Sequence, residues 1–147
     1  MKEKILNLAI FSLLFIWQLP QNIVALIMMP FLGKLKLIKY QDYCFAFEAD
    51  KMQGSISLGS FIFLCNSHAK EDTTIAHEFG HVWWSHAFGP LYVFIIGIPS
   101  IFWAGFRNRE KHPCYYSFYT EKWANDKAGL IAVLSSSGKY CTLEFKK

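Results

Sequence analysis

The sequence predicts a single α+β domain over residues 1–147 that is attached to a membrane. Its length of 147 residues suits one domain. Two long apolar segments, residues 5–33 and 89–106, contain no charged side chain and predict helices in contact with lipid. Residues 40–66, between these segments, are rich in β-forming residues, whereas most of the remaining chain has helical patterning.

The composition excludes several classes of protein. Hydrophobic residues make up 53% of the chain and charged residues only 18%, whereas an ordinary soluble domain contains about 25% charged residues. An aromatic content of 18% excludes an intrinsically disordered chain. The net charge of +4 comes without a long basic run, which excludes a dedicated nucleic-acid-binding protein. The lipid bilayer is therefore the first predicted partner.

The N-terminal apolar segment, residues 5–33, is longer than the stretch of about 20 residues that one membrane span needs. Residues 18–22 (QLPQN) interrupt it with a proline and three polar side chains, which disfavour one continuous helix. No small-residue cleavage site of a signal peptide follows. A tilted, kinked span and a shallow helical hairpin both remain open.

Residues 40–66 predict a β-hairpin. Strand-forming residues at 43–47 and 55–64 flank a turn, so the simplest arrangement is an antiparallel pair. Cys44 and Cys65 lie in these strands. They can form a disulfide if the chain is secreted, but buried free thiols are the expected state.

Two helices and a tail complete the polar part of the chain. The first helix covers residues 73–88 and ends at Gly89, and the second covers residues 113–129 with Gly129 as its C-cap. Residues 135–147 predict a tail that contains a turn and a short strand.

The first of these helices contains an HExxH motif, His77-Glu78-Phe79-Gly80-His81. His77 and His81 lie four residues apart, so both imidazoles leave one face of the helix and can bind one metal ion. Glu78 borders the same face, within reach of a metal-bound water. Gly80 costs about 1 kcal/mol relative to alanine inside a helix, which is understandable if another backbone segment passes close to it.

A catalytic zinc ion needs three protein ligands and a water molecule. The spacing HExxHxxGxxH is absent, because position 87 is Ala87. Glu121 on the second helix is the predicted third ligand. Asn125 lies on the same helix face one turn later, where it can form a hydrogen bond with a ligand histidine. The sequence thus predicts a Zn²⁺ site made by His77, His81 and Glu121.

Five motifs in combination resemble a family of small bacterial membrane-associated zinc peptidases of the gluzincin kind: WQLPQN (17–22), HEFGH (77–81), GPLY (89–92), GIPS (97–100) and YTEKWAND (119–126). The resemblance covers most of the chain. It implies a minimal zincin-like fold, in which a short antiparallel β-sheet accompanies the HExxH helix and the ligand helix. It also implies that Glu78 is the catalytic acid and base. The family usually has aspartate where Asn125 stands.

The predicted function is hydrolysis of a peptide or protein substrate. Zinc would acidify its bound water, and Glu78 would take the water's proton and deliver it to the leaving amine. An extended substrate could add as a strand beside residues 56–64. Candidate donors for the oxyanion are His112, Tyr115, Tyr116 and Tyr119.

Other classes of function remain open. One is a non-catalytic, membrane-bound binding or scaffold protein with a structural or degenerate zinc site. Another is a zinc hydrolase that acts on a lipid or a small amide. A helix whose histidines only face the membrane interface is the alternative without a metal.

The ligand set also constrains the topology. Glu121 can reach the two histidines only if residues 89–106 return to the same side of the membrane, so this segment is expected to be re-entrant, with its turn at residues 97–100. Basic residues follow both apolar segments. The positive-inside rule then predicts that the metal-bearing body lies on the cytoplasmic side of a bacterial cytoplasmic membrane.

Overall fold

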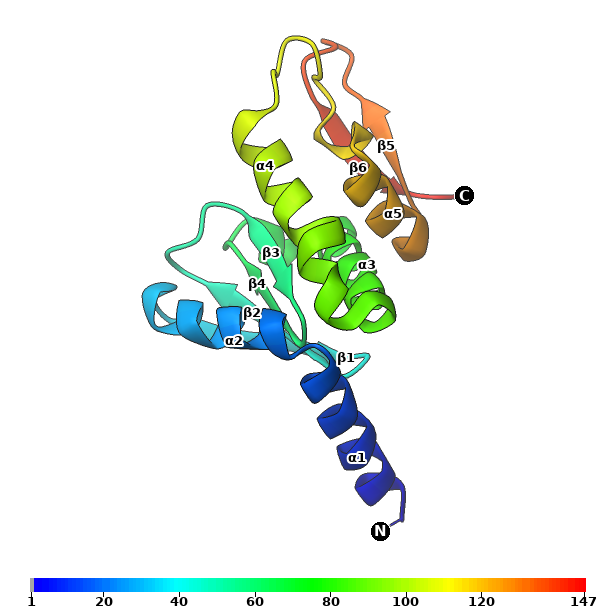
Figure 1. The fold of residues 1–147 in the computed structure, drawn as a ribbon. Helices are drawn as coiled ribbons and strands as arrows, with labels where there is room; N and C mark the ends of the chain where they lie inside the picture. The colour runs from blue at the N-terminus through cyan, green and yellow to red at the C-terminus, as the bar shows by residue number, and fades with distance from the viewer. Residues whose placement is uncertain (1) are drawn as a thin grey trace.

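The structure is a computed structural model that describes residues 2–147, and it confirms the α+β class. Figure 1 shows α1 projecting away from the rest of the molecule, a four-stranded sheet beside α2 and α3, and α5 next to a two-stranded ribbon. The helices are α1 (Lys2–Trp17), α2 (Leu19–Met28), α3 (Asp72–Phe88), α4 (Ile98–Phe106) and α5 (Tyr119–Ala128). The strands are β1 (Leu35–Gln41), β2 (Cys44–Ala49), β3 (Ser55–Leu58), β4 (Phe61–Leu64), β5 (Leu130–Leu134) and β6 (Cys141–Phe145).

The larger sheet is mixed, with the strand order β1-β2-β4-β3. The prediction of a simple antiparallel pair over residues 40–66 is wrong, because β2 and β4 run parallel, with Phe45 opposite Phe61. The predicted strand at residues 55–64 is two strands, separated by a tight turn at Gly59, whose φ is +61°. The chain reverses direction before β3 and again at Gly59, so β4 runs in the same direction as β2.

The two faces of this sheet pack against different helices. Phe45, Phe47, Phe61 and Phe63 face the cluster that includes Ala25 of α2. The alternate residues of β2 and β4 face α3 through Val82, Ile75 and Phe79; these sheet residues are Cys44, Ala46, Ile62 and Leu64. This alternation is the period of two that a strand imposes. It fixes α3 against the sheet, with its other side free to meet α5.

The polar residues that interrupt the N-terminal apolar segment are completely buried. Gln18, Gln21 and Asn22 have 0% exposed surface. Gln21 Nε2 donates to the Gly89 carbonyl at 2.7 Å, and Asn22 Oδ1 accepts from the backbone N–H of Ser60 at 2.8 Å. Besides breaking the helix, these amides therefore join α1 and α2 to the end of α3 and to the β3–β4 turn.

No single helix in residues 2–147 is long and apolar enough to cross a membrane. Two bent pairs meet the criterion by length and composition: α1 with the segment Leu19–Phe31, at 87°, and Asp72–Leu91 with Val93–Phe106, at 119°. The second bend lies between residues 91 and 93, not at residues 97–100 as predicted. Gly97 and Pro99 fall in a continuous helical stretch, in which the π-helix η4 (Val93–Gly97) leads into α4. Pro99, at the second position of α4, has no N–H to donate to the preceding turn, and the Ile95 carbonyl four residues earlier accepts from the Tyr119 hydroxyl instead.

The predicted helix over residues 113–129 begins later, at Tyr119, after a short 3₁₀ turn η5 (Tyr115–Ser117). It ends as predicted at Gly129, which takes the left-handed conformation of a C-cap (φ 67°). The tail forms β6, which pairs with the unpredicted strand β5. Cys44 and Cys65 are free and buried, as expected. Cys114 and Cys141 form a disulfide, which the spacing of the cysteines did not predict.

Replacing both bridged cysteines, in the variant Cys114→Ser/Cys141→Ser, is expected to lower the free energy of unfolding by about 3.5 kcal/mol. The bridge closes a loop with a sequence separation of 27 residues, and loop-closure entropy gives a value of that size. Denaturant unfolding with and without a reducing agent measures it. Equal stability of the oxidised wild type and the double variant would contradict the pairing.

Candidate metal centre

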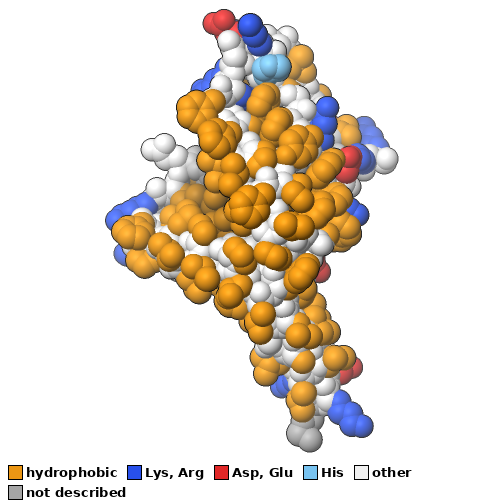
Figure 2. Space-filling view, viewed as in Figure 1, with side chains coloured by type: hydrophobic (Ala, Val, Ile, Leu, Met, Phe, Trp, Pro, Cys, Tyr) orange, Lys and Arg blue, Asp and Glu red, His pale blue; other side chains and the backbone are white. Residues whose placement is uncertain are grey.

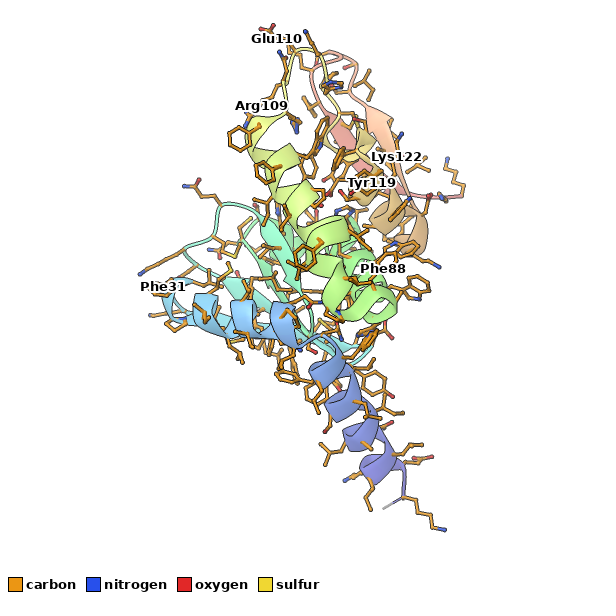
Figure 3. All side chains as sticks on the ribbon, in the orientation of Figure 1. Phe31, Phe88, Arg109, Glu110, Tyr119 and Lys122 are labelled. Carbon is orange, nitrogen blue, oxygen red and sulfur yellow. A yellow bond between two sulfur atoms is a disulfide. The ribbon has the colours of Figure 1, made fainter. Side chains whose placement is uncertain are left out.

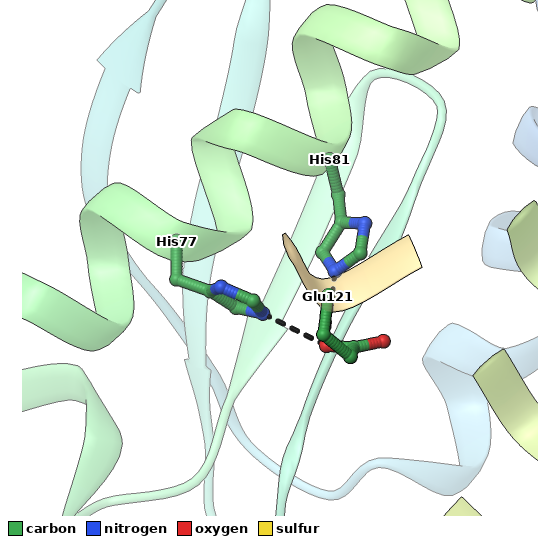
Figure 4. A group of neighbouring side chains, drawn as sticks. All are labelled: His77, His81 and Glu121. Atoms are coloured by element: carbon green, nitrogen blue, oxygen red, sulfur yellow. Dashed lines mark hydrogen bonds and ion pairs between the residues drawn. The ribbon is translucent and has the colours of Figure 1, made fainter. Parts of the chain in front are cut away.

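Three side chains from two helices converge at one point. His77 and His81 leave the same face of α3, and Glu121 reaches them from α5 (Figure 4). Glu121 Oε2 lies 3.1 Å from His77 Nε2 and 3.4 Å from His81 Nε2. All three side chains are buried, and their ligand atoms lie within 4.8 Å of one another. The predicted group of three is therefore brought together in a form that could hold a metal ion.

Two of the three separations between these atoms are of the size found in a tetrahedral metal site. Zinc binds imidazole nitrogen and carboxylate oxygen at about 2.0–2.2 Å with tetrahedral geometry, which places neighbouring ligand atoms about 3.3 Å apart. The two distances from Glu121 Oε2 to the imidazole nitrogens, 3.1 and 3.4 Å, lie close to that value.

The hydrogen bonding of His77 also fits a cation between the ligands. His77 Nδ1 lies 2.7 Å from Asn125 Oδ1. An amide oxygen is only an acceptor, so Nδ1 donates and the lone pair of a neutral imidazole is left on Nε2. His77 Nε2 and Glu121 Oε2 lie 3.1 Å apart, and a positive charge between them, either a proton on Nε2 or a bound metal ion, would satisfy both atoms. Asn125 thus lies where it was predicted, against a ligand histidine.

The buried carboxylates at the site also favour a bound cation. Glu78 and Glu121 are both buried, and no ion pair within residues 2–147 joins either of them to a lysine or arginine. Buried carboxylates without a cation are strongly disfavoured. A divalent cation among the three ligands would supply the missing charge.

The pKa values reflect this coupling. Burial alone would raise the pKa of Glu121, but the charge of His81 and hydrogen bonds from both histidines outweigh it and hold that pKa well below its usual range. Burial likewise opposes protonation of His77, whereas the carboxylates of Glu121 and Glu78 raise its pKa. The field at this point therefore attracts positive charge.

The second oxygen of Glu121 has partners of its own. Ser100 Oγ of α4 lies 3.0 Å from Glu121 Oε1, and Thr120 Oγ1 lies 3.1 Å from the same atom. The two hydroxyls are themselves 2.8 Å apart. Ser100 and Thr120 lie in the motifs GIPS (97–100) and YTEKWAND (119–126), but no spacing distinguishes either hydroxyl from ordinary packing.

Glu78, the predicted acid and base, lies beside the ligands and faces strand β3. Ser57 Oγ is 2.6 Å from Glu78 Oε2 and 3.0 Å from its backbone carbonyl. Because β3 is an edge strand of the sheet, its outer side is not paired with another strand. The site therefore borders an open strand edge. Of the segment 56–64, beside which a substrate strand was predicted to add, only β3 lies at this edge, because β4 is an internal strand.

The four candidate oxyanion donors are not all at the site. The ring of Tyr116 packs edge-on against His77, with 5.3 Å between centroids, and burial raises the pKa of Tyr116 to about 12. Burial and the nearby Glu121 also raise the pKa of Tyr115. Tyr119, labelled in Figure 3, donates its hydroxyl to the Ile95 carbonyl at 2.5 Å instead. His112 lies exposed in the α4–α5 connection and packs against Trp103 of α4.

One tyrosine near the site was not predicted. Tyr92 follows the turn after α3 and is buried. Burial raises its pKa, and the carboxylates of Glu78 and Glu121 add to the shift. The motif GPLY contains it, but nothing in the spacing distinguished this residue from ordinary packing.

Gly80 allows the two ligand helices to approach each other. A Cβ at this position would overlap the backbone carbonyl of Ala124 on α5. The predicted reason for a glycine here is therefore confirmed. Trp84, one turn later, donates its indole N–H to the Trp123 carbonyl at 2.9 Å and continues the same contact.

Two cavities near the site are not lined by the three candidate ligands. A cavity of about 870 Å³ lies along the opposite side of α3, lined by Phe79, Gly80 and Trp83 among others. A second, of about 520 Å³, reaches Tyr116 and Asn125 behind His77. The side chains of His77, His81 and Glu121 are themselves buried.

Comparisons of the chain with protein-family models, curated proteins and solved structures find no match. The resemblance to gluzincin-like peptidases, and the zincin-like fold that it implies, therefore stay predictions.

Proposed function

We propose that the protein is a membrane-associated, zinc-dependent metallopeptidase. The observation that carries this proposal is the buried group of His77, His81 and Glu121, with the carboxylate of Glu78 beside it. Two imidazoles, a carboxylate ligand and an adjacent carboxylate base are the residue types that metal-assisted hydrolysis uses.

Each residue of the site has a role in this proposal. A bound zinc ion would supply the Lewis acid that polarises the scissile carbonyl and acidifies a water molecule. Glu78 takes the proton of that water and delivers it to the leaving amine. Asn125 holds His77 in the tautomer whose Nε2 is free to bind. Tyr116, protonated at neutral pH, is the best placed of the predicted donors to the oxyanion.

One observation favours the alternative of a structural zinc site. Structural zinc sites are closed, whereas catalytic ones keep a position open to water and substrate. All three ligands here are buried, and neither of the large cavities reaches them. Catalysis at this site therefore requires that water and substrate gain access to the three ligands.

The first test is the zinc content of the purified protein and of Glu121→Ala. The wild type is expected to contain about one zinc ion per chain, and the variant only a small fraction of that. Asp126→Ala is the matched control, because Asp126 lies on the same helix but is exposed and pairs with Lys146 at 3.0 Å. Wild-type protein without zinc, after purification without chelators and addition of zinc, would overturn the proposal.

The proposed membrane contact is an apolar face made by α1, α2 and α4 with the turn before it. Figure 2 shows hydrophobic side chains covering this face. Its exposed members include Ile5, Leu6, Leu8, Leu13, Ile16, Ile23, Val24, Leu26, Ile27, Phe31, Leu91, Phe94, Ile98, Ile101, Phe102 and Phe106. Soluble monomers rarely expose more than about 600 Å² of continuous apolar surface. Lys2 and Lys4 lie at one end of the face and Arg109 (Figure 3) beyond the other, as contact with lipid headgroups requires.

Binding to vesicles tests this contact. The detergent-purified protein is expected to insert into phosphatidylcholine–phosphatidylglycerol vesicles and to float with them in a density gradient. Phe102→Glu/Phe106→Glu should weaken this association, because charges are costly among lipid chains. Lys146→Glu, which changes charge on the ribbon, is the control. Equal flotation of the wild type and the double glutamate variant would place the contact elsewhere.

Two observations favour opposite sides of the membrane for the metal site. The basic residues after the apolar segments favour the cytoplasmic side. The Cys114–Cys141 disulfide favours an oxidising compartment, because disulfides rarely persist in the cytoplasm. The formation of a disulfide depends directly on the redox compartment, whereas Lys2 and Lys4 weaken the charge asymmetry. We therefore propose the oxidising side for the site, in place of the cytoplasmic side that the sequence predicts.

A further inference from the structure

Glu121 is held by two separate sets of contacts, one for each carboxylate oxygen. Its Oε2 faces His77 and His81 at 3.1 and 3.4 Å. Its Oε1 faces the hydroxyls of Ser100 and Thr120 at 3.0 and 3.1 Å. Both hydroxyls can donate, and a carboxylate oxygen can accept both. The two sets of contacts therefore hold the plane of the carboxylate, because turning that plane away from this orientation would break all four of them.

We propose that Ser100 is a positioning residue for the metal ligand Glu121. This inference rests on the metal centre of the proposed function. With Thr120, Ser100 holds Glu121 Oε1, so Oε2 is the oxygen that would be available to a metal ion. Hydrogen-bonded partners of this kind set the orientation of a ligand, and their loss commonly weakens metal binding about 10–100-fold.

Ser100 comes from a different part of the structure than the ligands do. Thr120 precedes Glu121 directly in α5, whereas Ser100 lies on α4, in the second apolar segment. Its neighbours Ile101 and Phe102 are 61% and 59% exposed on the proposed membrane face. Trp103 secures the helix by donating to the Tyr115 carbonyl at 2.8 Å. The Ser100 hydroxyl therefore links the position of α4 to the orientation of the Glu121 carboxylate.

The test is the zinc affinity of the detergent-purified chain, measured by competition with a chromophoric chelator. Ser100→Ala is expected to weaken zinc binding about 10–100-fold. Ser100→Thr keeps the hydroxyl and should stay close to the wild type. Ser12→Ala is the control, because Ser12 lies on α1 and bonds only to the Leu8 carbonyl. Thr120→Val preserves the side-chain shape, removes the other hydroxyl and should weaken binding in the same direction.

A second readout separates positioning from a loss of folding. The visible absorption of the cobalt-substituted protein reports the geometry of the metal, so Ser100→Ala should alter the bands whereas Ser12→Ala should not. Unchanged zinc affinity and an unchanged cobalt spectrum in both Ser100→Ala and Thr120→Val, beside loss of metal in Glu121→Ala, would overturn the positioning role and leave the metal centre intact. Wild-type protein that binds no metal would overturn both proposals.

Discussion

Glu78→Gln is expected to lower the rate of peptide hydrolysis about 10²–10⁴-fold, the contribution typical of a positioned acid and base, while the zinc content stays near that of the wild type. The amide has almost the same shape as the carboxylate, and its oxygen can still accept from Ser57 Oγ, which lies 2.6 Å from Glu78 Oε2. The fold and the three ligands should therefore be unaffected. Only the ability to take a proton from water is removed.

The comparison uses cleavage of a quenched-fluorescent peptide library, with zinc content and thermal unfolding measured on the same samples. Glu71→Gln is the matched control, because it makes the same chemical change just before α3, where Glu71 accepts from Thr74 at 2.8 Å. A rate in Glu78→Gln equal to that of the wild type would exclude Glu78 as the base. A zinc-loaded wild type that cleaves no member of the library would favour the structural zinc site.

The grouping of His77, His81 and Glu121 could be predicted because it depends on helical periodicity. Four residues separate His77 from His81, and four separate Glu121 from Asn125, so each pair shares one helix face whatever the rest of the fold does. Each pair is short in sequence and made of residues with distinctive chemistry. Pairing the two helices needed only the requirement of zinc for a third ligand.

The supporting contacts could not be predicted, because they join residues that no local pattern relates. Ser57 and Glu78 are 21 residues apart, as are Ser100 and Glu121. A hydroxyl in an apolar strand or helix is consistent with many packings, and only the assembled fold selects one. The parallel pairing of β2 with β4 was missed for a similar reason. It depends on the turn at Gly59, where a glycine within β-forming residues was interpreted as part of one strand.

Gly80→Ala is expected to destabilise the protein by about 3 kcal/mol, the upper part of the range for overpacked sites, and to weaken zinc binding at the same time. The new methyl group would overlap the Ala124 carbonyl of α5. This obstacle is backbone, so no change of rotamer can relieve it. The two helices must separate, and since His77 and His81 lie on one and Glu121 on the other, the ligands separate with them. A helical alanine alone would have stabilised α3 by about 1 kcal/mol.

Gly105→Ala is the matched control, because Gly105 is also helical but a Cβ there meets nothing within 4 Å. It should be neutral or stabilise the protein by up to about 1 kcal/mol, with zinc binding unchanged. Thermal unfolding of the zinc-free proteins and zinc competition compare the two variants directly. If Gly80→Ala unfolded like Gly105→Ala and bound zinc as the wild type does, α3 and α5 could not be in the contact described, and Glu121 could not reach the histidines. Loss of stability together with loss of zinc, in the variant at position 80 alone, would instead tie the metal centre to this one close approach of the two helices.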